Sequence, residues 1–155
     1  MRKGDSKMNN IAQIGQWNVA IDIAKTSEQY KKRWDLCDCT YCMNFYEAIK
    51  TIPANAYKLF TQLGINPSVI NHLSHFEENE EKLHHYIGCY PLVGSFSRLD
   101  KKSRQTEDEE SFTVNKQLSI WFTNDLEFVP GFFPRPVIQL EFEIYLPWVL
   151  DEPAE

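Results

Sequence analysis

The sequence predicts an α+β domain in which a mainly antiparallel sheet carries two or three helices packed on one face. Three observations lead to this fold class. Residues 137–146 alternate strictly between two faces, one of them apolar, and in residues 118–123 the apolar Leu118, Ile120 and Phe122 alternate with Ser119, Trp121 and Thr123; both patterns are typical of strands with one buried face. Residues 41–63 contain two amphipathic helical segments, and these can cover the apolar face of the sheet.

The first predicted elements are a strand and a short helix. Apolar side chains recur at period two from Trp17 to Ile23, which indicates a strand. Next, Thr26 and Gln29 have the spacing of a capping box, in which a hydroxyl accepts a hydrogen bond from an orphan amide at a helix start. This predicts a helix that ends at about Trp34.

The next two predicted helices meet at a proline. Residues 42–52 place apolar side chains at helical spacing, and Pro53 disfavours the helical conformation at the residue before it. Pro53 can itself begin the second helix, because its missing N–H would be unpaired there anyway. Gly64 suits the left-handed position after the last turn, and Ile65 can then fold back onto the helix in a Schellman motif.

The middle of the chain is less regular. Residues 68–76 fit neither the helical nor the strand period, so both structures stay open. The acidic residues 77–81 are expected in a loop or on a solvated face. Residues 86–96 are rich in aromatic and branched side chains but contain glycine and proline, which predicts a bulged or edge strand.

The length and the low-periodicity segments bound the domain organisation. With 155 residues, 1–155 is expected to be a single domain that folds without metal or disulfides. Residues 1–15 are polar and lack a clear period, which predicts an N-terminal tail. Residues 98–111 are dominated by charged side chains and predict a mobile loop.

The charge balance disfavours two classes of partner. The chain has 16 Lys and Arg against 22 Asp and Glu, a net charge of −6, whereas nucleic acids and anionic membranes bind clustered basic residues. Its longest uncharged stretches are too polar for a membrane span, and no secretory signal is present. We therefore expect a cytoplasmic protein with reduced cysteines that binds neither nucleic acid nor membrane.

The sharpest local feature is a segment that contains Cys37, Cys39 and Cys42. Structural zinc prefers four thiolate or imidazole ligands, and Cys39 and Cys42 form the Cys-x-x-Cys spacing that such sites often use. No second Cys-x-x-Cys is present, so the site would need another cysteine or a histidine: Cys89, His72, His75, His84 or His85. Alternatively, these cysteines are small, semi-buried residues, with Cys42 on the apolar face of its helix.

Two histidines complete the candidate metal set, which is Cys37, Cys39, Cys42, His72 and His75 with zinc as the ion; the competing expectation is no cofactor. His72 and His75 would share one face of a helix but point to opposite faces of a strand. His84 and His85 follow the acidic segment and are expected to be exposed. A redox role is a further option, because a helix N-terminus after Cys39 would lower a thiol pKa.

Other candidate chemistry is weaker. Glu141 and Glu143 share one strand face about 7 Å apart, which is compatible with a carboxylate pair but equally typical of a solvent-facing strand. Signatures of nucleotide-binding loops and nucleophile elbows do not occur in the sequence. The adjacent Phe132 and Phe133 must either pack inward or be presented to a partner.

Five segments together resemble a family of small uncharacterised proteins from Gram-positive bacteria. The segments are Trp17-Asn-Val-Ala-Ile-Asp22, Cys39-Thr-Tyr-Cys-Met-Asn-Phe45, Leu63-Gly-Ile-Asn-Pro67, Pro136-Val-Ile-Gln-Leu-Glu-Phe142 and Leu146-Pro-Trp-Val-Leu150. The resemblance implies a bacterial cytosolic protein in which the Cys39 to Phe45 segment belongs to the common pattern. It implies no catalytic residue, and the charged residues 98–110 resemble a local insertion.

These observations give two hypotheses of different class. The first is a non-catalytic, cytosolic protein-binding or regulatory domain, for example an immunity-like or inhibitor-like protein, since complementary charge accelerates association. A homodimer is a further option if a strand edge or aromatic patch is exposed. The alternative is a metal-binding or thiol-dependent enzyme that uses Cys37, Cys39 and Cys42.

Overall fold

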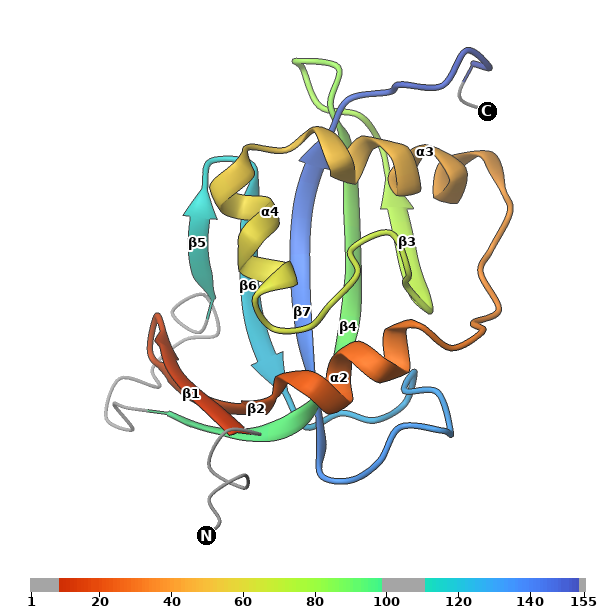
Figure 1. Ribbon diagram of the computed structural model, residues 1–155. Helices are drawn as coiled ribbons and strands as arrows, with labels where there is room; N and C mark the ends of the chain where they lie inside the picture. Colours follow the sequence, from red (N-terminus) through yellow and green to blue (C-terminus); the bar gives the residue numbers. More distant parts are fainter. Residues whose placement is uncertain (1–8, 99–110, 154–155) are drawn as a thin grey trace, which may run out of the picture.

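The computed structural model describes residues 9–98 and 111–153 of the chain. Within these residues, seven strands form one sheet, and three α-helices lie on one face of it (Figure 1), which confirms the predicted α+β class. The strands are β1 (Asn9–Ile14), β2 (Trp17–Asp22), β3 (His72–Phe76), β4 (His84–Arg98), β5 (Phe112–Asn115), β6 (Leu118–Thr123) and β7 (Val137–Leu146). The helices are α2 (Ile23–Tyr30), α3 (Thr40–Ala48) with the 3₁₀ turn η1 (Ile49–Thr51), and α4 (Ala54–Thr61).

The sheet has the order β1-β2-β4-β7-β6-β5, and β3 pairs with β4 beside this path. Every strand pair is antiparallel. Strand β4 pairs with β7 from His84 to Val93, while its other edge is shared between β3 and β2. Of the two predicted possibilities for residues 86–96, a bulged strand or an edge strand, the edge strand is wrong, because β4 lies inside the sheet.

Side chains of α2 explain how β4 accommodates a proline inside the sheet. The pairing with β3 ends at Cys89 and the pairing with β2 begins at Gly94. Between them, the Tyr30 hydroxyl donates to the Pro91 carbonyl at 2.9 Å, and the Val93 N–H donates to Thr26 Oγ1 at 3.0 Å. Because these contacts replace the strand ladder there, the missing N–H of Pro91 leaves no ladder bond unmade.

The core lies between the helices and the sheet. Phe45 of α3 and Phe60 of α4 are fully buried against the ring of Phe142 on β7, with centroids 5.9 and 6.4 Å apart. Burial of each such side chain stabilises the fold by roughly 1.5–3 kcal/mol. The alternation predicted for β6 and β7 is confirmed, since their inward-facing residues are buried. The described residues therefore share one sheet and one hydrophobic core.

The end of α4 confirms the predicted Schellman motif. The Ile65 N–H donates to the Phe60 carbonyl at 3.1 Å, and Gly64 has a φ of +92°. A Cβ on Gly64 would lie 2.8 Å from the carbonyl oxygen of Ile23, so glycine also permits the close approach of this loop to α2. Pro53 precedes α4 as its N-cap residue rather than being its first residue.

Two predictions near the N-terminus need correction. Residues 9–14 are strand β1 rather than part of a polar tail, because Gly15, with a φ of +59°, lets the chain turn back into β2. Helix α2 is capped by Asp22, whose carboxylate accepts from the Lys25 N–H at 3.0 Å, and it ends at Tyr30. Thr26 is therefore a buried residue within the helix rather than its cap.

Several predictions lie outside the described residues. These are the tail at residues 1–8 and the charged loop over residues 99–110.

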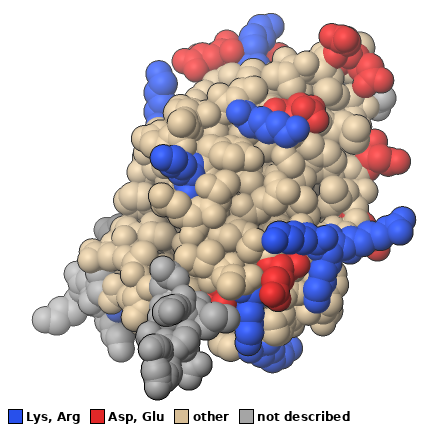
Figure 2. Space-filling view, in the orientation of Figure 1, with Lys and Arg blue, Asp and Glu red and all other residues tan. Residues whose placement is uncertain are grey.

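On the face that carries the helices, basic and acidic side chains are scattered around an uncharged centre (Figure 2). Within residues 9–98 and 111–153, no helix is long and apolar enough to span a membrane.

Candidate metal centre

The structure brings Cys37, Cys39 and Cys42 together, and we refer to them as the cysteine group. Their sulfur atoms all lie within 4.8 Å of one another. Cys39 is the N-cap residue of α3, with an extended backbone, and its carbonyl accepts from the Met43 N–H at 2.9 Å. Cys42 lies in the first turn of α3, and the three-residue spacing turns its side chain toward Cys39. The grouping predicted from the Cys-x-Cys-x-x-Cys spacing is therefore present in the fold.

A tyrosine holds the loop that carries Cys37. Tyr46 lies one turn after Cys42 on α3, and its hydroxyl donates to the Cys37 carbonyl at 2.6 Å. The Cys39 N–H points at Cys37 Sγ at 3.4 Å. These two contacts hold the backbone that follows Cys37 and the Cys37 side chain. Tyr46 was not a candidate in the sequence, although an aromatic residue four positions after a helical cysteine is the signal that could have found it.

The thiols of the cysteine group differ in their environment. The pKa of Cys37 is lowered, first by the Cys39 N–H that points at its sulfur and then by hydrogen bonds from the thiols of Cys39 and Cys42. The pKa of Cys42 is raised, because burial disfavours its thiolate and the neighbouring sulfurs add to the effect. The N-terminus of α3 also favours negative charge at this place. Cys37 therefore ionises more readily than Cys42.

The separation of the sulfurs suits a zinc ion after small side-chain rotations. Tetrahedral zinc binds thiolates at about 2.3 Å, which places the sulfurs about 3.8 Å apart. Cys37 and Cys39 are exposed, so their side chains can make this adjustment, whereas Cys42 is buried and fixed by the helix. Three soft thiolates are a donor set that favours zinc or copper(I) over magnesium and calcium.

The structure does not bring His72 or His75 into the cysteine group. Because β3 is a strand, these two side chains lie on opposite faces of the sheet. The His72 ring stacks on Phe128 with centroids 3.7 Å apart, on the face opposite the helices. Across residues 9–98 and 111–153, no histidine, aspartate or glutamate joins the three cysteines.

His75 and His84 instead form a hydrogen-bonded pair, which we call the histidine pair. His75 Nε2 lies 2.9 Å from His84 Nδ1, and His84 Nε2 lies 3.4 Å from Glu78 Oε1. Tyr41 stacks on the His75 ring, and Trp148 packs near His84. His84 is buried, contrary to the expectation of an exposed residue. Burial lowers the pKa of His75, and the neighbouring His84 and His85 lower it further.

Polar groups on the other face of the sheet have separate partners. Glu141 accepts hydrogen bonds from Trp121 Nε1 at 3.1 Å and Thr123 Oγ1 at 3.2 Å. Glu143 lies 2.7 Å from His85 Nε2. Cys89 is buried there, and its pKa is raised to about 12 by burial and then by nearby carboxylates. Each of the two glutamates thus has its own neighbours: Trp121 and Thr123 for Glu141, and His85 for Glu143.

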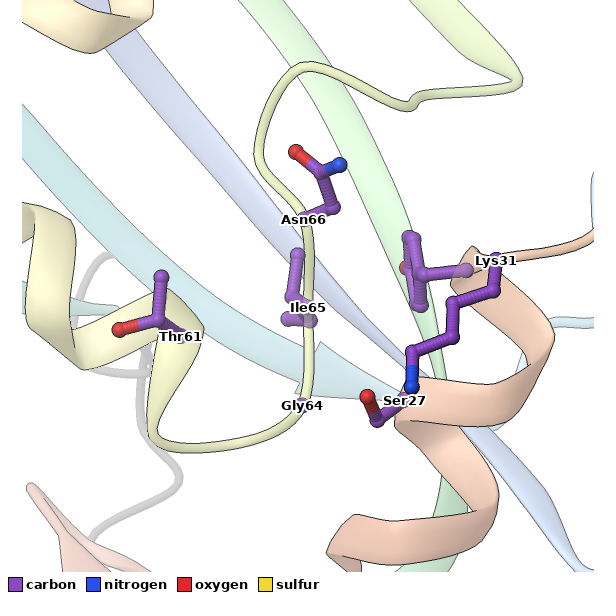
Figure 3. Close-up of a pocket in the computed structure, with 7 residues that line it drawn as sticks. Ser27, Lys31, Thr61, Gly64, Ile65 and Asn66 are labelled. Carbon is purple, nitrogen blue, oxygen red and sulfur yellow. The ribbon is translucent and has the colours of Figure 1, made fainter.

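A hollow of about 250 Å³ lies between α2 and the loop after α4 (Figure 3). The lining residues are Ser27, Tyr30, Lys31, Thr61, Gly64, Ile65 and Asn66. Tyr30 is occupied by its hydrogen bond to Pro91, and no cluster of ligating groups converges here among the described residues. Nearby, Phe133 is buried against Tyr30, whereas Phe132 is exposed beneath Lys32. We assign no function to this hollow.

The fold and the cysteine group define a class of protein only: an α+β domain with three convergent thiols at a helix N-terminus. In comparisons with known proteins, no family model, no curated protein and no solved structure matches the chain. The function must therefore be argued from the geometry of this chain.

Proposed function

We propose that this protein binds a thiophilic metal ion, zinc, through the thiolates of Cys37, Cys39 and Cys42. The observation that carries the proposal is the convergence of the three sulfurs within 4.8 Å at the start of α3. Thiolates are the preferred ligands of zinc in proteins, and a bound cation would also relieve the repulsion between three ionised sulfurs.

Packing alone does not account for the cysteine group. Buried cysteines often act as small apolar residues, but Cys37 and Cys39 are exposed and contribute no core contact. The loop nevertheless returns Cys37 to the helix start through the hydrogen bond from Tyr46. A redox pair needs two thiols, whereas here a third sulfur also lies within 4.8 Å, which favours a metal over a disulfide.

The metal is proposed as a bound ligand and not as a folding element. The core is built from Phe45, Phe60, Phe142 and their neighbours, and the cysteine group lies at its margin. Asn44 anchors α3 independently, since its side chain bonds the Pro147 carbonyl at 3.1 Å and the Val149 N–H at 2.7 Å. Removal of the metal should therefore loosen residues 31–39 and leave the rest of the fold intact.

The hypothesis of a protein-binding or regulatory domain stays a prediction. Its best support is that Leu36 and Met43, on either side of the cysteines, expose 39% and 44% of their surface. Exposed apolar side chains beside a metal loop would suit a contact with a partner. A homodimer and a bacterial cytoplasmic origin likewise stay predictions.

A competition titration tests the proposal. Reduced protein is titrated with zinc in the presence of a chromophoric chelator, and the protons released are counted in a weakly buffered solution. We expect about one zinc per chain and a release of two to three protons, because thiols must ionise to bind. A chain that fails to compete with the chelator, or that binds zinc without proton release, would contradict the proposal.

A further inference from the structure

We infer that the metal held by the cysteine group keeps one coordination position for a ligand from outside the chain, of thiolate or imidazole chemistry. This inference rests on the proposed function and deepens it. Structural zinc sites use four protein ligands, whereas sites that bind or activate a ligand use three and leave the fourth position open. The fourth position stays open if the chain has no fourth sulfur or nitrogen ligand within reach of the metal.

No further cysteine of the chain can reach the cysteine group. It contains four cysteines, and all four lie in the described residues. Cys89 is the remaining one, and it is buried on the sheet face opposite α3, in register with Glu141. A side chain on that face cannot reach the start of α3 without unfolding β4. Cysteine as the fourth ligand is thereby excluded for a single chain.

The four histidines have other partners than the cysteine group. The chain has four, and all of them are described. His72 stacks on Phe128 and His85 pairs with Glu143, both on the face opposite the helices. His75 and His84 are on the helix face, but His75 Nε2 is hydrogen-bonded to His84 Nδ1 at 2.9 Å. The other ring nitrogen of His84 lies 3.4 Å from Glu78 Oε1. Recruiting either one would break this arrangement.

The exposure of the site allows an outside ligand to approach. Cys37 and Cys39 are both exposed, and the loop over residues 33–38 has no regular structure that would cover them. Carboxylates remain the one other kind of side chain that could fill the position, yet none in the described residues joins the group. Three thiolates make the ion soft, which favours a thiolate or imidazole over a carboxylate as the fourth ligand.

Cobalt(II) in place of zinc gives a direct test. Protein loaded with cobalt(II) is titrated separately with imidazole and with 2-mercaptoethanol while its absorption spectrum is recorded. Intense sulfur-to-cobalt charge-transfer bands should appear on loading, and the ligand-field bands should then shift saturably with each added ligand. Absence of the charge-transfer bands would refute the proposed function itself. Charge-transfer bands with ligand-field bands that neither ligand moves would refute only the open position.

A matched variant separates an internal ligand from an open position. His75→Ala removes the histidine that stacks on Tyr41 of α3 and does not alter the cysteine group. We expect its cobalt spectrum, and the response to imidazole, to match those of the wild type. If the wild type does not respond but His75→Ala does, His75 is the fourth ligand and the inference is overturned.

Discussion

The cysteine group and the histidine pair both lie beside α3, but their side chains differ in the partners that they have within the chain. In the histidine pair, both rings have partners within the chain: His84 bonds His75 and faces Glu78, and Tyr41 stacks on His75. In the cysteine group, the three sulfurs lie within 4.8 Å of one another, and the contacts of Cys37 Sγ are the Cys39 N–H and the two neighbouring thiols. The histidine pair is thus satisfied within the chain, whereas the cysteine group is the place for which we propose a bound metal ion.

The largest expected difference concerns thiol reactivity in the metal-free protein. The thiolate is the reactive form, the pKa of Cys37 is lowered, and that of Cys89 is raised to about 12. Alkylation at neutral pH, followed by mass spectrometry of peptides, should therefore modify Cys37 about a thousandfold faster than Cys89. Equal rates for the two residues would contradict the account. Added zinc should protect Cys37.

The next effect is loss of metal on removal of a ligand. Cys42→Ser should weaken zinc binding on the order of 100-fold or more, because it removes one of three thiolates from the ion. The matched control is Cys89→Ser, which alters another buried cysteine and should leave affinity unchanged. Competition with a chromophoric chelator measures both. Similar losses in the two variants would mean that Cys42 acts through stability and not as a ligand.

A smaller effect is expected for the residue that holds the loop. Tyr46→Phe removes the hydroxyl that donates to the Cys37 carbonyl at 2.6 Å and should lower zinc affinity about tenfold. The loss of one partly exposed hydrogen bond should cost only about 1 kcal/mol in the free energy of unfolding of the metal-free protein. If stability falls with no change in affinity, Tyr46 supports the helix and does not position the site.

The smallest effect is a pH dependence that belongs to the histidine pair. Burial and the nearby histidines lower the pKa of His75 below its usual 6.5, so the unfolded chain binds more protons than the folded one between these two values. Stability should be fully present above about pH 6.5 and fall by less than about 1 kcal/mol as the pH drops below it, because His75 is partly exposed. His75→Gln should flatten this slope in urea titrations. An unchanged slope would assign it to other groups.

The comparison also explains which features could be predicted from sequence. Strands β6 and β7 follow from local alternation, and the end of α4 follows from Gly64 and Ile65, because both signals are local. The cysteine group follows from the three-residue spacing at a helix start. Its loop geometry could not be predicted, since the Tyr46 hydrogen bond to Cys37 depends on where the chain returns.

Other features depend on contacts between distant segments. The glycines and the proline of residues 86–96 predict a bulged or edge strand, yet β4 lies inside the sheet because Tyr30 and Thr26 of α2 bond the backbone around Pro91. Residues 72–76 became a strand through pairing with β4, which no local period indicates. That pairing separates His72 from His75. The pairing with β4 therefore makes this segment a strand, and it also places His72 on the sheet face opposite the helices.

One measurement tests the central claim most directly. Untagged, reduced protein is loaded with zinc, desalted without chelator and analysed for metal, and its thiols are counted before and after denaturation with a chelator. The account predicts about one zinc per chain, with all four thiols protected in the native protein, three by the metal and Cys89 by burial. Protein that retains no zinc and exposes Cys37 and Cys39 to the thiol reagent would contradict it.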